Sequence, residues 1–164
     1  GLLSSRGNKE DARLAATKRN AMPVIDLKEL AIKLQNIFSR INLNTIDPEE
    51  IDAYLDKRDG DPFDSGWSSA YKQVEEQKKV SHSKKHLKDV DVANRRLREW
   101  VFKQVMKETE SSDLASYLSD DFGLIFDALA DTSITQSGAF HIFEMYRHGT
   151  LPSGQILVEA RPSI

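Results

Sequence analysis

The most regular pattern in the sequence is a stripe of apolar residues that recurs every three or four positions between residues 27 and 41. Its members are Leu27, Leu30, Ala31, Leu34, Ile37, Phe38 and Ile41. This spacing places them on one face of an amphipathic α-helix. Asp26 precedes the stripe and Glu29 follows three residues later, which is the arrangement of a capping box. The pattern predicts a helix that begins after Asp26 and turns its apolar face towards a core.

A second helix is predicted from residue 48 to residue 58. Asp47 is suited to cap it, Pro48 fits the first helical position, and Glu50 completes a capping box. The turn-forming residues 59–62 (DGDP) end it.

Two longer helical segments follow in the middle of the chain. The first is expected to begin after Asp64 or Ser65, and its buried side is formed by Trp67, Ala70, Tyr71 and Val74. The second spans residues 90–106 and has an apolar face so wide that it predicts a central helix packed on two sides. Residues 81–88 between them show no decisive pattern.

Shorter helices are predicted in the last third of the chain. Ser112 is suited to cap one short helix and Ser119 to cap a separate one that follows it. A final helix is expected over residues 134–146, and Gly149 followed by Pro152 is a normal stop signal.

Together these segments predict an all-α protein, a single-domain orthogonal bundle of about six helices. The helical domain is expected to span residues 23–152, because the residue before Pro23 is disfavoured in helical geometry. Residues 1–22 are expected to form a flexible basic arm, and residues 153–164 an extended tail. The β-prone residues 156–158 in that tail either lie along the helices or fray.

Composition excludes several classes of protein. The 164 residues contain no cysteine, which excludes disulfide scaffolds and thiolate metal sites and indicates a reducing compartment such as the cytoplasm. No apolar run approaches the roughly 20 residues that cross a bilayer, so no membrane partner is expected. The formal net charge of -3 excludes a globally basic nucleic-acid-binding protein.

Patterns typical of metal and cofactor sites are incomplete in this sequence. His82 and His86 are four residues apart, but the zinc-protease pattern requires glutamate after the first histidine, where Ser83 stands. Four aspartates crowd residues 56–64, yet with Gly60 as the EF-hand glycine the first and third loop positions are not acidic. No glycine-rich phosphate loop occurs either, so we expect no metal and no cofactor.

A catalytic role would depend on the remaining histidines. His141 and His148 lie seven residues apart and could share a helix face with Glu144. No nucleophile with a defined setting accompanies them. An enzyme is therefore the third hypothesis, and it requires one of these imidazoles to meet carboxylates of distant helices in a cleft.

Charge is strongly segregated along the chain. Residues 44–64 carry a net charge of -6, residues 72–107 of +6, and residues 108–131 of -7. Two explanations stay open: the blocks neutralise one another within the fold, or an exposed acidic surface steers a basic partner. The predicted partner-binding residues are Asp113, Asp120, Asp121, Asp127 and Asp131, joined by Asp47, Glu49, Glu50 and Asp52.

The basic block supports an alternative function, a regulatory helical domain that contacts nucleic-acid phosphates. Its candidate residues are Lys84, Lys85, Lys88, Arg95, Arg96 and Arg98. Against this reading, Glu99 interrupts the basic side, and Leu97 and Trp100 belong to the apolar stripe. If the stripe around Trp100 and Phe102 were partly exposed, it would favour a homodimer.

Two segments near the C-terminus occur together in a recognisable order. Residues 119–125 (SDDFGLI) open a helix, and residues 146–152 (YRHGTLP) end the domain. Over residues 114–152 the chain resembles small all-helical bacterial proteins of toxin-immunity and uncharacterised families. The resemblance implies a non-catalytic protein that binds and blocks a partner, often through an acidic surface. The leading hypothesis is therefore an immunity or toxin-neutralising protein whose partner is another protein with a basic surface.

Overall fold

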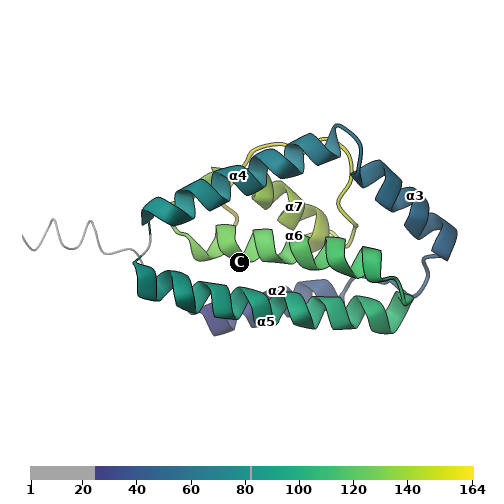
Figure 1. Ribbon diagram of the computed structural model, residues 1–164, viewed down its shortest axis with the longest axis horizontal. Helices are drawn as coiled ribbons and strands as arrows, with labels where there is room; N and C mark the ends of the chain where they lie inside the picture. The colour runs from purple at the N-terminus through teal and green to yellow at the C-terminus, as the bar shows by residue number, and fades with distance from the viewer. Residues whose placement is uncertain (1–24, 82) are drawn as a thin grey trace, which may run out of the picture.

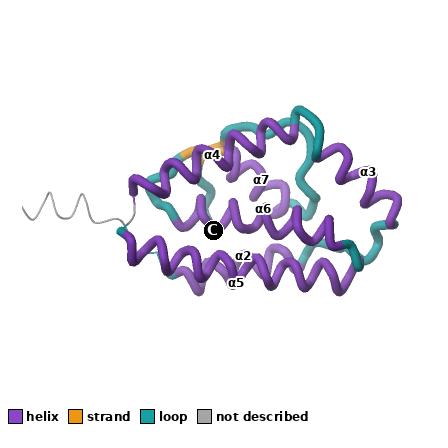
Figure 2. Tube along the Cα trace, in the orientation of Figure 1, coloured by secondary structure: helices purple, strands orange, loops and turns teal. Residues whose placement is uncertain are grey.

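The computed structural model describes residues 25–81 and 83–164, and it confirms the predicted all-α architecture (Figures 1 and 2). The helices are α2 (Leu27–Ser39), α3 (Pro48–Arg58), α4 (Phe63–Ser81), α5 (Lys84–Thr109), α6 (Ser112–Ala130) and α7 (Gly138–Arg147). Strands β1 (Gln136–Ser137) and β2 (Glu159–Ala160) form a short antiparallel pair. The predicted arm at residues 1–22 lies outside the described residues. Among the described helices, none combines the length and apolar composition needed to cross a bilayer.

Helix α6 is the centre of the bundle. It contacts all five other described helices and runs between α4 and α5 in Figure 1. Residues 121–130 are all buried, so this stretch has no side that faces solvent. The helix predicted over residues 90–106, α5, packs against both α6 and α2, as expected of a helix packed on two sides. The prediction that it is central is wrong, because its charged side is exposed while Leu97 and Val101 are buried.

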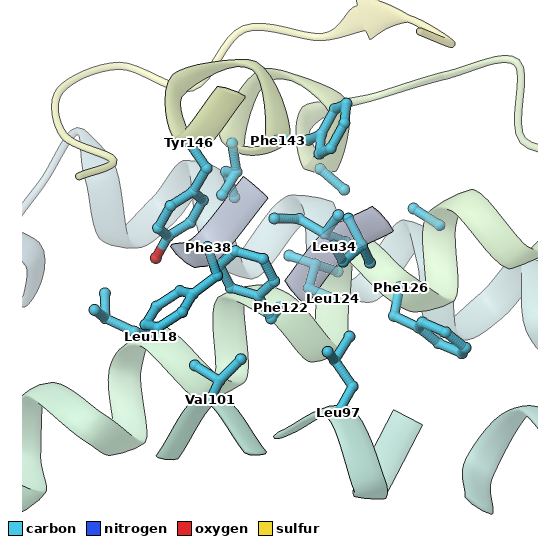
Figure 3. Close-up of a cluster of buried hydrophobic side chains, with 14 of the residues drawn as sticks. Leu34, Phe38, Leu97, Val101, Leu118, Phe122, Leu124, Phe126, Phe143 and Tyr146 are labelled. Carbon is cyan, nitrogen blue, oxygen red and sulfur yellow. The ribbon is translucent and has the colours of Figure 1, made fainter. Parts of the chain in front are cut away.

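Aromatic side chains of α2, α6 and α7 meet around Phe122 of α6 (Figure 3). The Phe122 ring contacts Phe38 of α2 edge to face at 5.4 Å and Tyr146 of α7 at 4.6 Å between ring centroids. Phe38 also meets Trp100 of α5 edge to face at 5.7 Å. Such arrangements are the favoured ones for aromatic pairs, so this cluster joins α2, α5, α6 and α7.

The capping predictions hold at one helix start and only partly at the next. Asp26 accepts hydrogen bonds from the amides of Lys28 and Glu29 at 3.1 Å, which confirms the first start. Helix α3 begins at Pro48 as predicted, but the Asp47 side chain makes no capping hydrogen bond. The fixed backbone angle of proline and the acidic first turn mark this start instead.

Helix α4 begins earlier than predicted, at Phe63 rather than after Asp64 or Ser65. The Asp61 carboxylate accepts from the Ser65 amide at 3.1 Å and so satisfies one of the free amides of the first turn. Tyr71, expected on the buried side of this helix, is 46% exposed.

Helix α6 is continuous where the sequence predicted two short helices. Ser111, not Ser112, caps it by accepting from the Leu114 amide at 3.2 Å. The Ser119 hydroxyl donates to the carbonyl of Ser116 at 3.4 Å and therefore lies within the helix rather than at a cap. Burial on every side favours one long helix, because a break here would leave backbone groups unpaired in the core.

The C-terminal tail lies along the helices, which was the first of the two alternatives. Gly149 has a φ angle of 84° after α7, as the stop signal predicted. Further on, the Leu157 amide donates to Nδ1 of His141 at 2.7 Å, and Glu159 pairs opposite Ser137 between the two strands. Leu157 itself stays exposed.

Replacing Phe122 with alanine should lower the free energy of unfolding by about 3–5 kcal/mol, because it removes the ring at the centre of the aromatic cluster. Chemical denaturation measures this loss. Ile32→Ala on α2 is the control, since Ile32 is 49% exposed and should change stability by less than about 1 kcal/mol. Equal losses in the two variants would contradict the central position of Phe122.

Candidate partner-binding face

Asp121 is the centre of a buried polar cluster. Its carboxylate accepts two hydrogen bonds from the guanidinium of Arg58, at 2.6 and 2.7 Å. It also accepts from Nε1 of Trp67 at 2.9 Å and from the Tyr146 hydroxyl at 2.6 Å. Asp121 is fully buried and Arg58 is 7% exposed. Four donors satisfy the buried carboxylate, which makes this charge tolerable in the core.

The Arg58 guanidinium is held on several sides. Burial by itself would lower its pKa, but the neighbouring Asp121 carboxylate outweighs this and raises the pKa above its ordinary value. The guanidinium lies over the rings of Phe63 and Tyr117, at 4.6 and 5.2 Å from their centroids. It also donates to the Tyr54 hydroxyl at 3.3 Å. Arg58 therefore stays charged and balanced inside the protein.

Asp127 forms a second cluster, six residues further along α6. It accepts from Lys78 of α4 at 3.1 Å and from the side-chain amide of Asn94 at 2.9 Å. The same Asn94 amide donates to the carbonyl of Gly123 at 2.8 Å. Burial raises the pKa of Asp127, and the Lys78 ammonium opposes that effect.

Asp131 closes the C-terminal end of α6. Its carboxylate accepts from the Ser81 hydroxyl at 2.7 Å and from the Ser133 amide at 3.1 Å. Arg161 of the tail donates to the carbonyls of Asp131 and Ile134 at 2.9 Å. A cation is thereby placed where the terminal carbonyls of a helix need donors.

The prediction that Asp121, Asp127 and Asp131 belong to an exposed acidic surface is therefore wrong. All three are buried and hydrogen-bonded. The physical reason is that α6 is surrounded by other helices, so an acid in its second half has no solvent to face. Their apolar neighbours in the sequence were the available signal, because residues 122–130 contain no polar residue except Asp127.

The other predicted acidic residues are exposed. Asp113 and Asp120 lie on the first half of α6, and the remainder lie at or within the first turns of α3: Asp47, Glu49, Glu50 and Asp52. Asp120 forms an ion pair with Arg98 at 2.9 Å, and both side chains are nearly half exposed. Burial raises the pKa of Asp120, and Arg98 opposes the shift. Whether these acids bind a partner stays a prediction.

Trp67 lines two neighbouring depressions of the protein surface. The larger, about 500 Å³, lies between α4 and α5 above α6, and its lining includes Tyr71, Arg95 and Arg98. The smaller, about 180 Å³, is lined by Arg58, Asp59, Phe63, Asp64, Trp67, Tyr117 and Asp120. Trp67 and Asp120 border both depressions, so the two form one surface. We call this surface, together with the adjacent Asp113, the Trp67 face.

Contacts with neighbouring residues fix the side chains of the Trp67 face. The Trp67 ring stacks on Tyr71 at 5.6 Å with an interplanar angle of 10°, while its Nε1 is fixed by Asp121. Gly123 allows Arg98 to cross α6, since a Cβ there would lie 2.7 Å from Cδ of Arg98. The face therefore has fixed aromatic walls and a charged rim.

The candidate nucleic-acid residues lie on α5, and all of Lys84, Lys85, Lys88, Arg95, Arg96 and Arg98 are exposed. Asp91 and Glu99 are exposed on the same helix among them. Arg98 is directed to Asp120 by its ion pair. Nucleic-acid binding therefore stays an untested alternative.

Of the histidines in and directly after α7, His141 contacts the tail and His148 lies at the surface. His82 lies outside the described residues, and within those residues no group of three side chains is placed to hold a metal. His141 holds the tail through the Leu157 amide, and His148 is exposed with its Nε2 3.9 Å from Glu144.

Trp100, the candidate dimer residue, is partly buried against Phe38, and the homodimer stays a prediction.

Sequence reasoning missed the residues that pair with the buried acids, and none of them was singled out. Arg58 and Lys78 neutralise Asp121 and Asp127. The Asn94 amide donates to the Asp127 carboxylate, and Arg161 donates to the backbone carbonyl of Asp131. For Arg58 a signal existed, because it continues the inward stripe of Ile51 and Leu55 on α3.

Replacing Asp121 with asparagine should lower the free energy of unfolding by about 3–5 kcal/mol, because Arg58 would keep a buried charge without its counter-ion. The adjacent Asp120→Asn is the matched control. It breaks only a half-exposed ion pair and should cost about 1 kcal/mol or less. Thermal and urea unfolding of both variants provide the comparison, and a loss at Asp121 no greater than at Asp120 would refute the buried pairing.

Comparison with known proteins identifies the family. The family described as Immunity protein PIM1 matches residues 28–153, which include every described helix except the first residue of α2 and exclude residues 154–164 of the tail. No curated protein and no solved structure matches the chain. The match covers most of the sequence and extends the resemblance seen over residues 114–152 to almost the whole bundle. The chain belongs to the PIM1 family of immunity proteins.

Proposed function

We propose that this chain neutralises a toxin by binding it directly through the Trp67 face. Membership of an immunity protein family supports a role in protection, and such families are generally non-catalytic. The proposed mechanism is obstruction: the bound chain covers a basic surface that the toxin needs.

One observation carries the choice of surface. Asp64 and Asp113 are exposed, and within the described part of the chain neither carboxylate has a hydrogen-bond or ion-pair partner. Asp64 lines the smaller depression together with the partly exposed rings of Trp67 and Tyr117. Asp113 lies close enough to Tyr117 to influence it electrostatically. Unpaired acids accelerate association with a basic partner, and aromatic rings supply contact area once the two surfaces meet.

The direct test begins with a search of the genes next to this chain's reading frame for a toxin-like protein, and uses that protein. Co-expression with the chain should restore growth of cells that make the active toxin. Purified chain should bind a catalytically inactive form of the same toxin in biolayer interferometry. Absence of both protection and binding would refute the proposed function. Salt-dependent binding to mixed-sequence DNA or RNA without toxin binding would favour the nucleic-acid alternative instead.

Reversing the two unpaired charges, Asp64→Lys with Asp113→Lys, should slow association with the inactive toxin by about tenfold at low salt and flatten its salt dependence. Interferometry at two or more ionic strengths measures both effects. Two matched substitutions, Asp89→Lys and Glu76→Lys, make the same charge change at exposed sites outside the Trp67 face and should slow association much less. If both pairs slow association equally, net charge rather than this surface governs binding.

A further inference from the structure

The smaller depression of the Trp67 face has an unusual combination of walls. Three aromatic rings line it, from Phe63 and Trp67 on α4 and from Tyr117 on α6. Three carboxylates also line it, those of Asp59, Asp64 and Asp120. Its volume of about 180 Å³ is on the scale of a single long side chain rather than a folded segment.

The one cation in the lining does not neutralise these acids. Arg58 forms the inner wall, but its guanidinium is engaged by Asp121 through two hydrogen bonds and by the Tyr54 hydroxyl. The positive charge of Arg58 is therefore compensated by the buried Asp121 carboxylate. Asp120 is partly compensated by Arg98, whereas Asp64 has no partner among the described residues. The depression keeps an excess of negative charge at its rim.

The walls are fixed before any partner arrives. Trp67 is held by its hydrogen bond to Asp121 and by stacking on Tyr71. The Tyr117 hydroxyl donates to the Asp59 carboxylate, which links one aromatic wall to one acid of the rim. A depression fixed in this way loses little conformational entropy when it is filled.

We infer that this depression receives an arginine side chain of the partner protein, an inference that rests on the proposed function. A guanidinium is flat and cationic, so it stacks on aromatic rings and forms paired hydrogen bonds with carboxylates. An apolar side chain would remove water from three carboxylates without replacing its hydrogen bonds, and an acidic one would be repelled. Lysine carries the charge but lacks the planar group that matches aromatic walls.

The test uses a small probe that needs no toxin. Nα-acetyl-L-arginine N-methylamide is titrated into the full chain, and the indole ¹⁵N–¹H signals of the two tryptophans are followed by NMR. The Trp67 signal should move in a saturable way, whereas the Trp100 signal should not, because Trp100 packs against Phe38 of α2. The equivalent citrulline compound has nearly the same shape without the charge and should produce no saturable shift. Equal responses to both compounds, or no saturable response of Trp67 to arginine, would overturn the inference.

Two matched substitutions separate the depression from the general charge of the face. Asp64→Asn should weaken binding of the arginine probe at least threefold, because it removes a carboxylate of the rim. Asp113→Asn makes the same change at an exposed acid outside the depression and should leave probe binding within experimental error. Equal effects of the two would show that only net charge matters and would overturn the inference.

The same two variants then connect the depression to the toxin. If the wild-type chain binds the inactive toxin, Asp64→Asn should accelerate its dissociation more than Asp113→Asn does. Unchanged dissociation of Asp64→Asn would overturn the arginine inference and leave the proposed function intact. Failure of the wild-type chain to bind toxin, with arginine still bound at Trp67, would instead refute the proposed function alone.

Discussion

Enclosure of α6 by the other described helices is the constraint on which the rest of the structure depends. A helix that faces no solvent over residues 121–130 must satisfy each of its polar groups from neighbouring elements. Asp121 is satisfied from α3, α4 and α7, and Asp127 from α4 and α5. Asp131 is met by the end of α4 and by the loop that follows α6. Each carboxylate therefore links a different set of neighbouring elements to α6, at its own position along the bundle.

The same constraint determines how the charge blocks of the sequence are used. The acidic block over residues 108–131 is partly neutralised within the fold, by Arg58 from the first acidic block and by Lys78 and Arg98 from the basic block. Other acids of both acidic blocks, among them Asp64 and Asp113, remain at the surface. Neutralisation within the fold and an exposed acidic surface therefore both occur, in different parts of one chain.

Trp67 joins the interior to the proposed binding face. The nitrogen of its indole is committed to the buried Asp121, while its ring stacks on Tyr71 and borders both depressions. The buried cluster thus has two consequences, because it stabilises the bundle and also fixes the orientation of an aromatic wall. Asp120 and Asp121 lie on opposite sides of the boundary between the surface and the interior. They are adjacent in sequence but about 100° apart around the helix, so one is nearly half exposed and the other is fully buried.

The sequence by itself determined the all-α class, the start of α2 after Asp26, the extent of α3 and the stop at Gly149. These follow from local rules, because helix periodicity, capping and turn residues act over a few positions of the chain. It also pointed to an immunity family through residues 114–152, and the match over residues 28–153 confirmed that reading. Only the tertiary structure decided that α6 rather than α5 is central, and that Asp121 and Asp127 within α6 and Asp131 at its end lie inside. Burial depends on which helices surround a residue, and partners such as Arg58 and Asp121 are 63 positions apart. No local pattern contains that information, because it arises only when the helices pack together.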